Sequence, residues 1–410
     1  MADSPGRAGQ DRPYTFGMPE VAYLDHAATT PLRPEALAAM TPYLTGAFGN
    51  PSGQHSVARE AKTGLEIARE QVAAALGCQP SEVVFTAGGT EADNLALIGA
   101  AHAARPCRRG IVTTAFEHKG VLAAADRLAA EGDDVVVVGV GPDGIVDLDR
   151  LADALDPSTA VVSVMLVNNE VGTIQPLDAV AALVRERAPD ALLHTDAVQA
   201  VPWLPVAELT AAADLVSVSA HKFGGPKGVG ALVVRNGVTL EPRAIGGGQE
   251  RGLRSGTVNV AGAVGMAAAL RVTNEDRAAD VARVRVLRDR LAAGLDAIDG
   301  AVVHGDRARV VAGNHHLRFE GVAAEALLVA LDLEGVCAAA GSSCASGAAE
   351  PSHVLLAMGL TRDDARAAVR FSLGATSTDA DVDHALAVVP RAVEQLRGRA
   401  RVSQPVAALG

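Results

Sequence analysis

The sequence has few cysteines and little positive charge, and each shortage excludes a class of protein. Four cysteines are spread over 410 residues, and no two of them form a Cys-x-x-Cys pair. So few and so scattered cysteines exclude a disulfide framework. The formal net charge is -12, whereas nucleic acids and anionic membranes bind clusters of lysine and arginine. We therefore expect no direct binding of nucleic acid.

Signals for membranes and metals are also missing. No stretch approaches the roughly 18 consecutive apolar residues of a membrane-spanning helix. The first 20 residues are polar and lack the apolar core of a signal peptide, so we expect a cytoplasmic protein without a membrane association. The 11 histidines form no His-Glu-x-x-His motif and no Cys/His cluster, so no metal site is predicted.

What the sequence does contain predicts an ordered α/β protein. Hydrophobic residues make up 49% of the chain and charged residues 20%, which is typical of a globular protein. Through the first two thirds, short β-rich runs alternate with helical patterns such as 56–76. Strands that alternate with helices predict a mostly parallel sheet covered on both faces. The strands predicted for this sheet are 82–86, 110–114, 134–138, 159–165, 191–195 and 214–219.

The sequence pattern changes near residue 271, and this change predicts a second domain, as the length of the chain also suggests. From there the sequence is Arg-rich and helical, with short strand candidates at 301–304, 316–319 and 369–373. We expect four parts: a flexible extension at 1–20, a large domain at 21–270, a smaller α/β domain at 271–398 and a tail at 399–410.

Reactive side chains stand where the predicted strands end, which is where ligands bind in open parallel sheets. Lys222 follows the strand 214–219 inside a glycine-rich turn. A lysine there can form a Schiff base if its amine is partly desolvated, although a surface lysine in an ordinary Gly-Pro turn is the alternative. Asp196 follows the strand 191–195 and can pair with a protonated pyridine nitrogen.

Further strand ends support a pyridoxal phosphate site. Gly88, Gly89 and Thr90 open a helix whose backbone N–H groups can hold a phosphate, although glycines open many helices for steric reasons alone. His118 follows the strand 110–114 and can lie on the pyridine ring or move protons, unless it is only a satisfied polar group. Side-chain donors to the ring oxygen and the phosphate would come from Gln199, Ser219 and His221.

In this order, these elements resemble the class V aminotransferase group of fold-type I pyridoxal-phosphate (PLP) enzymes, and within it the cysteine desulfurases. The likeness runs over 21–393. It implies a fold-type I PLP-dependent transferase, with a mostly parallel sheet in the large domain and a smaller α/β C-terminal domain. It also implies pyridoxal 5'-phosphate as cofactor, L-cysteine as substrate and a homodimer with its sites at the interface. The matching segments are Tyr23-Leu-Asp-His-Ala-Ala-Thr-Thr-Pro31, Gly88-Gly-Thr-Glu91, Asn168-Asn-Glu170-Val-Gly-Thr, His194-Thr-Asp196, Ser219-Ala-His-Lys222, Gly246-Gly-Gly-Gln-Glu-Arg-Gly-Leu-Arg-Ser-Gly-Thr257 and Glu350-Pro-Ser-His353-Val-Leu.

The resemblance also implies roles for single residues. Thr257 would reach the phosphate of the neighbouring subunit's cofactor, and Asn169 would contact the cofactor ring oxygen and the substrate. Arg370 would bind the substrate carboxylate, a role that suits a planar bidentate donor, with a strand-end salt bridge as the alternative. Ala375 stands where family members often carry a basic residue, which bears on rate or on the acceptor rather than on the reaction class.

Cys344 differs from the other cysteines because small, polar and flexible residues surround it. Cys78, Cys107 and Cys337 suit the ordinary role of small apolar side chains, and Cys337 is a weak second candidate for the working thiol. By the resemblance, Cys344 takes the sulfur of L-cysteine, leaves alanine and stores the sulfur as a persulfide. The stretch 334–351 resembles the family branch that passes sulfur to an acceptor protein for iron-sulfur cluster assembly or for thiolation of tRNA or cofactors.

Other functions remain open at this point. A selenocysteine lyase or another class V aminotransferase would share the cofactor residues, and a transaminase would not need Cys344. A non-catalytic partner in sulfur-carrier assemblies is the remaining alternative. Its weakness is that Lys222, Asp196, His118 and Cys344 are all present.

Overall fold

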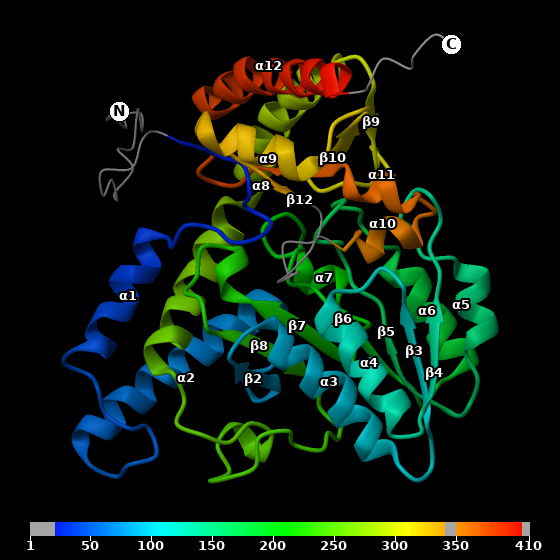
Figure 1. Ribbon diagram of the computed structural model, residues 1–410. Coiled ribbons are helices and arrows are strands. Elements are labelled where there is room, and N and C mark those ends of the chain that lie inside the picture. The colour runs from blue at the N-terminus through cyan, green and yellow to red at the C-terminus, as the bar shows by residue number, and fades with distance from the viewer. Residues whose placement is uncertain (1–20, 341–349, 404–410) are drawn as a thin grey trace, which may run out of the picture.

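The computed structural model describes residues 21–340 and 350–403, which form a larger and a smaller unit around separate hydrophobic cores (Figure 1). The larger unit is built on a seven-stranded sheet in the order β2-β8-β7-β6-β5-β3-β4. Every strand except β8 runs in the same direction. The strands are β2 (Val83–Thr86), β3 (Gly110–Thr114), β4 (Asp134–Val138), β5 (Thr159–Ser163), β6 (Leu192–Asp196), β7 (Leu215–Ser219) and β8 (Gly230–Val234).

Helices cover both faces of this sheet, as the alternation of strands and helices predicts. Neighbouring strand residues point to opposite faces, so Ile111 packs in the core beneath α3 and α4 while Val112 packs in the core on the other face. Helix α2 occupies Ser56–Leu76 and ends at Gly77, whose φ of 65° is a left-handed conformation that glycine adopts easily. The other helices of this unit are α1 (Pro34–Leu44), α3 (Gly89–Ala104), α4 (Lys119–Ala130), α5 (Leu148–Ala154), α6 (Leu177–Arg187), α7 (Val206–Leu209) and the short η1 (Pro80–Glu82), η2 (Ala220–Lys222) and η3 (Glu250–Gly252).

The smaller unit contains a four-stranded antiparallel sheet in the order β12-β13-β10-β9. Helix α8 (Val260–Asp296) joins the two units, because its first half packs in the large core and its second half in the small one. The predicted boundary at 270 therefore falls inside a helix. The remaining elements are β9 (Ala301–Val303), β10 (Asn314–Phe319), α9 (Ala324–Leu333), β11 (Val336–Cys337), β12 (Ala339–Ala340), α10 (His353–Ala357), α11 (Arg362–Arg366), β13 (Ala368–Ser372) and α12 (Asp379–Ser403).

Both ends of the described chain differ from the predicted division. Strand β1 (Ala22–Tyr23) pairs in parallel with β11, and Ala22 and Leu24 lie in the core of the smaller unit. Helix α12 continues to Ser403, past the predicted end at 398. The sequence pattern did not reveal β1, because a two-residue strand is too short to show a period. Within the described ranges, no helix combines the length and the apolar character needed to cross a bilayer.

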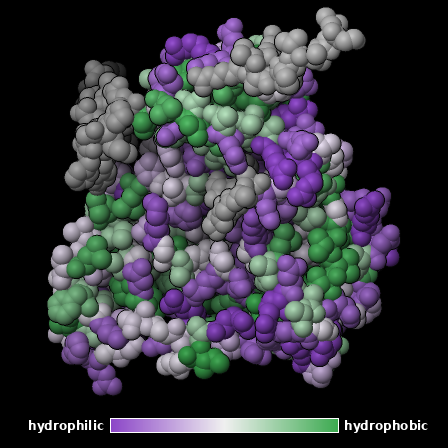
Figure 2. All heavy atoms as spheres, viewed as in Figure 1, coloured by the Kyte–Doolittle hydropathy of each residue, from purple (hydrophilic) through white to green (hydrophobic). Residues whose placement is uncertain are grey.

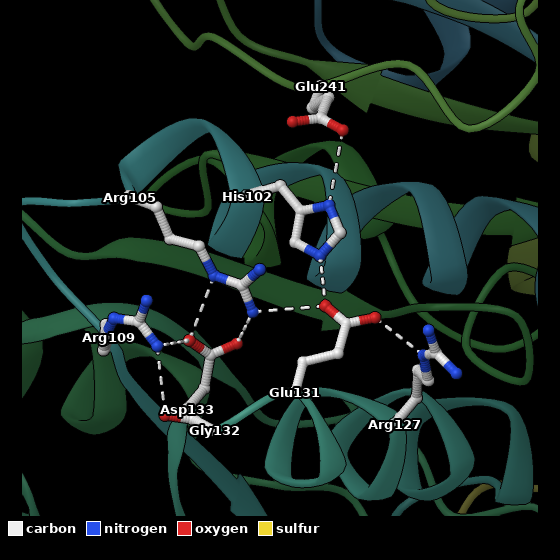
Figure 3. A network of polar contacts seen from close by, with 8 residues as sticks. All are labelled: His102, Arg105, Arg109, Arg127, Glu131, Gly132, Asp133 and Glu241. Carbon is white, nitrogen blue, oxygen red and sulfur yellow. Dashed lines mark hydrogen bonds and ion pairs between the residues drawn. The ribbon is translucent and has the colours of Figure 1, made fainter.

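A network of charged side chains joins the ends of α3 and α4 (Figure 3). Glu131 is its centre, with Arg127 Nε 2.6 Å from Oε1 and His102 Nε2 2.7 Å from Oε2. Arg105 contacts Glu131 and also Asp133. The hydrogen bonds from Arg127 and His102 lower the pKa of Glu131 from 4.5 to about 2.

This shift predicts a pH-dependent contribution to stability. Because the folded pKa is lowered, the stabilisation is present above the unfolded pKa of 4.5 and is lost as the pH falls toward 2. Glu131→Gln should lower the Tm at pH 7 by about 1 °C, and the difference from wild type should shrink between pH 4.5 and pH 3 in calorimetry. Glu60→Gln, an exposed position in α2, is the control. A Tm difference that does not change with pH would contradict this role.

Candidate active site

Lys222 lies at the end of η2, the short helix that follows strand β7 directly. Its amine donates hydrogen bonds to the carbonyl oxygens of Ala27 at 2.6 Å and Ala28 at 2.9 Å. The turn that carries it is held by its own backbone, since Gly225 N donates to the carbonyl of Ala220 at 2.9 Å. The structure thus places the predicted Schiff-base lysine at a strand end, beside a segment from the beginning of the chain.

That segment, residues 25–30, is named the N-terminal strap here. Besides the contacts to Lys222, the Ala27 carbonyl accepts from Gln199 Nε2 at 2.7 Å. Thr29 Oγ1 lies 3.1 Å from His221 Nδ1, and Thr30 Oγ1 donates to the His221 carbonyl at 2.8 Å. The sequence predicts no role for the strap residues, because their contacts to Lys222 and Gln199 are made by backbone carbonyls, which every residue has.

Asp196 ends β6 and is only 4% exposed. Its Oδ1 accepts from Val198 N at 2.8 Å. Burial raises its pKa, and the positive charges of His118 and Lys222 oppose that rise. Asp196, His118 and Lys222 therefore lie close enough at this edge of the sheet to affect one another's charge.

His118 caps the N-terminus of α4, and its Nδ1 accepts from Gly120 N at 3.0 Å. An imidazole nitrogen that accepts a hydrogen bond carries no proton, so a neutral His118 holds its proton on Nε2. The cap thereby fixes both the position of the ring and the nitrogen that can donate.

A pocket of about 600 Å³ opens beside Thr29 of the strap and His221, the residue before Lys222. Gly89 begins α3, and a Cβ on Gly89 would meet Val198 Cγ2 at 2.8 Å, so a larger residue does not fit there without a shift. Burial lowers the pKa of His221 to about 4, with the charges of Lys222 and Lys227 as further causes. A helix N-terminus, a neutral imidazole and lysines fit the phosphate of PLP. The residues that line the pocket are Thr29, Ala87, Gly88, Gly89, Thr90, Glu91, His221, Lys227 and Gly228.

Two buried carboxyl groups behind Asp196 were not predicted. Burial raises the pKa of Glu117 to about 8, although its Oε1 accepts from Met165 N at 2.8 Å. Burial also raises the pKa of Asp93 well above its usual value, and the charge of Asp196 adds to the rise. Both shifts favour the neutral carboxyl and so limit the negative charge beside Asp196. The available signal was a carboxylate at a buried helix position, as Asp93 is in α3.

Arg370 joins three elements near the site. On β13, its side chain is 2% exposed, and Nη1 donates to the Asn169 carbonyl at 2.6 Å. Its Nη2 lies 2.7 Å from Asp25 Oδ1 in the strap. The salt bridge that the sequence offered as an alternative is therefore present, and binding of the substrate carboxylate stays a prediction.

The remaining predicted residues lie in different places. Ser219 ends β7, and its Oγ lies 3.8 Å from the point where a Cβ on Gly88 would be. Thr257 is exposed between η3 and α8 and does not line the pocket. Cys337 lies on β11, and burial raises the pKa of its thiol, which disfavours the reactive thiolate. Cys344 lies outside the described residues.

Comparison with known proteins places this geometry in a family. The model of the class V aminotransferase family matches residues 22–385. An "IscS-like cysteine desulfurase" of Mycobacterium tuberculosis is 47% identical over 385 residues, covering 92% of this chain and 97% of that protein. A solved "NifS-like protein" is 36% identical with a TM-score of 0.86, over 92% of this chain and 100% of its own. The solved structure of "SspA in complex with cysteine" is 31% identical with a TM-score of 0.75, over 87% and 99%.

The family match covers most of the chain, and the fold agrees with it. The large, mostly parallel sheet and the smaller C-terminal unit have the architecture expected of a fold-type I PLP enzyme. The chain belongs to the class V aminotransferase family, among its PLP-dependent cysteine desulfurases.

Proposed function

We propose that this enzyme removes sulfur from L-cysteine, forms L-alanine and holds the sulfur as a persulfide on Cys344 before passing it to an acceptor protein. The observation that supports this most directly is the meeting of Lys222, Asp196 and His118 at one edge of the sheet. A relative of known structure was solved with cysteine, which supports the same substrate here.

The cofactor would be held by the residues that line or border the pocket. Gly89, Thr90, Ser219 and His221 would bind its phosphate, and Asp196 would pair with its ring nitrogen. When bound, PLP supplies an electron sink that stabilises negative charge on the substrate. Two further residues would act on the ring oxygen, Gln199 and Asn169.

The chain's own residues would then bind the substrate and move protons. Arg370 would hold the carboxylate of L-cysteine, since a guanidinium binds carboxylates in a planar, bidentate way. Lys222 would take the proton from the substrate's α-carbon, and His118, with its donor at Nε2, would supply or accept a proton at the reacting atoms. Asp196 is only 4% exposed, so water has little access to the carboxylate that would pair with the ring nitrogen.

The sulfur transfer balances without an outside oxidant. The thiolate of Cys344 attacks the sulfur of L-cysteine, so that an S–S bond forms and the substrate's carbon–sulfur bond breaks. The bonding electron pair stays on the substrate carbon, which takes a proton to become L-alanine. Cys344 ends as a persulfide, from which an acceptor thiol or a reductant removes the sulfur.

We propose a homodimer, in which Thr257 of one subunit reaches the phosphate site of the other. Thr257 is exposed in the single chain, as such a role needs. Large apolar side chains are also exposed at the end of α1 and just after it, and Figure 2 shows apolar residues on the side of the molecule where α1 lies. Leu44 is 61% and Phe48 74% exposed, which favours a partner surface over them.

Turnover of L-cysteine with a thiol reductant tests the proposal. We expect alanine and sulfide in equal amounts, and no sulfide release without the reductant. Release of selenium from selenocysteine with no turnover of cysteine would indicate a selenocysteine lyase instead. Amino transfer to a 2-oxo acid would indicate an aminotransferase.

A further inference from the structure

Lys227 lies at the rim of the pocket that Gly88, Gly89, Thr90 and His221 also line. The turn between η2 and β8 holds it there. Ala220 N donates to the Val229 carbonyl at 3.1 Å, which closes the base of the turn. Gly228 follows with a φ of 77°, a conformation that side chains rarely adopt. The lysine is exposed, but its backbone is fixed beside the pocket.

Lys227 differs in charge from the other titratable side chains that line the pocket. Glu91 is neutralised by Arg254, whose Nε lies 2.8 Å from Oε1. The pKa of His221 is lowered to about 4, so His221 is neutral near pH 7. Across residues 21–340 and 350–403, Lys227 makes no ion pair at 4.0 Å or less with a carboxylate. Its charge reaches into the pocket, because it contributes to the lowered pKa of His221.

A phosphate ester needs more positive charge than the helix alone offers. At neutral pH such a phosphate carries about -1.5 to -2 charges, whereas a helix N-terminus provides roughly +0.5. Neutral His221 would contribute hydrogen bonds and no net charge, and Lys222 would hold the aldehyde of the cofactor. We infer that Lys227 supplies the positive charge that balances the phosphate of PLP in this pocket, an inference that rests on the proposed function.

Binding of PLP and of pyridoxal, which lacks the phosphate, tests this role on the full-length apoprotein. Lys227→Gln should raise the Kd for PLP about tenfold and leave the Kd for pyridoxal within about twofold of wild type. Lys227→Arg keeps the charge and should bind PLP nearly as wild type does. The PLP association rate of Lys227→Gln should also depend less on salt. Absorbance changes on mixing report the Kd and the association rate. Lys62→Gln, at an exposed position of α2, is the matched control.

Each contrary outcome has a clear meaning. Equal PLP affinity in Lys227→Gln and wild type at low salt would overturn the inference. So would an equal loss of affinity for PLP and pyridoxal, since the effect would then not concern the phosphate. Failure of the wild-type protein to bind PLP at all would overturn the proposed function itself.

Discussion

Cys344→Ala should abolish sulfide release from L-cysteine while the visible absorbance of the bound cofactor stays intact. The variant lacks the thiolate that attacks the substrate's sulfur, and no other group in the proposed mechanism can store that sulfur. Loss of a catalytic nucleophile typically costs a factor of about 10³ or more in rate. Sulfide and alanine should be measured at matched cofactor loading, so that a loss of PLP is not mistaken for a loss of chemistry.

Two other cysteines provide controls for this prediction. Cys337→Ala removes the half-buried thiol on β11, and Cys107→Ala removes an exposed one. Both should keep wild-type turnover within about twofold, because neither thiol takes part in the proposed mechanism. Undiminished sulfide release by Cys344→Ala would exclude the persulfide mechanism and favour the lyase. A loss seen with Cys337→Ala alone would move the role to that residue.

Lys222→Ala should remove the covalent link to the cofactor and lower the rate of alanine formation by about 10³-fold or more. The amine is the only part of the side chain that can form the link. In the structure the amine is held against the N-terminal strap by the carbonyls of Ala27 and Ala28. The pocket itself should remain, so the variant should still bind PLP without a covalent bond.

Borohydride reduction followed by peptide mass spectrometry measures this without relying on activity. In the wild type, the reduced cofactor should be found on the peptide that contains Lys222, and in Lys222→Ala on no peptide. Lys62→Ala, at an exposed position of α2, should behave as wild type. Attachment of the cofactor to Lys227 in the wild-type protein would contradict the prediction and assign the Schiff base to Lys227.

The sheet could be predicted from the sequence because its strands are short β-rich runs between helices with a clear period. The limits of α2 agree with the predicted 56–76. Strand β8 was missed, because it follows the lysine turn directly and returns antiparallel, without the intervening helix that marked the other strands. The division near 270 fell inside α8, since a helix that packs in both cores changes its partners without breaking its period.

The candidate site could be predicted where residue type and strand end coincide, as at Lys222 and Asp196. Contacts made by backbone atoms or by residues from distant parts of the chain could not. The carbonyls of the strap are one case, and the salt bridge between Arg370 and Asp25 is another. The buried carboxyls Asp93 and Glu117 were missed because burial, which raises their pKa values, becomes known only from the fold.

The N-terminal strap also has a consequence for the order in which the protein is completed on the ribosome. Ala27 N donates to Ser372 Oγ at 2.9 Å across 345 residues of sequence, and β1 pairs with β11. The partners of the first described residues are thus among the last to be synthesised. A nascent chain can form its large sheet early, but the contacts that tie the strap to β11 and β13 form only after those strands have emerged. A translation product that stops before β13 would therefore keep the strands of the large sheet and lack both Arg370 and the partner of Ala27, Ser372.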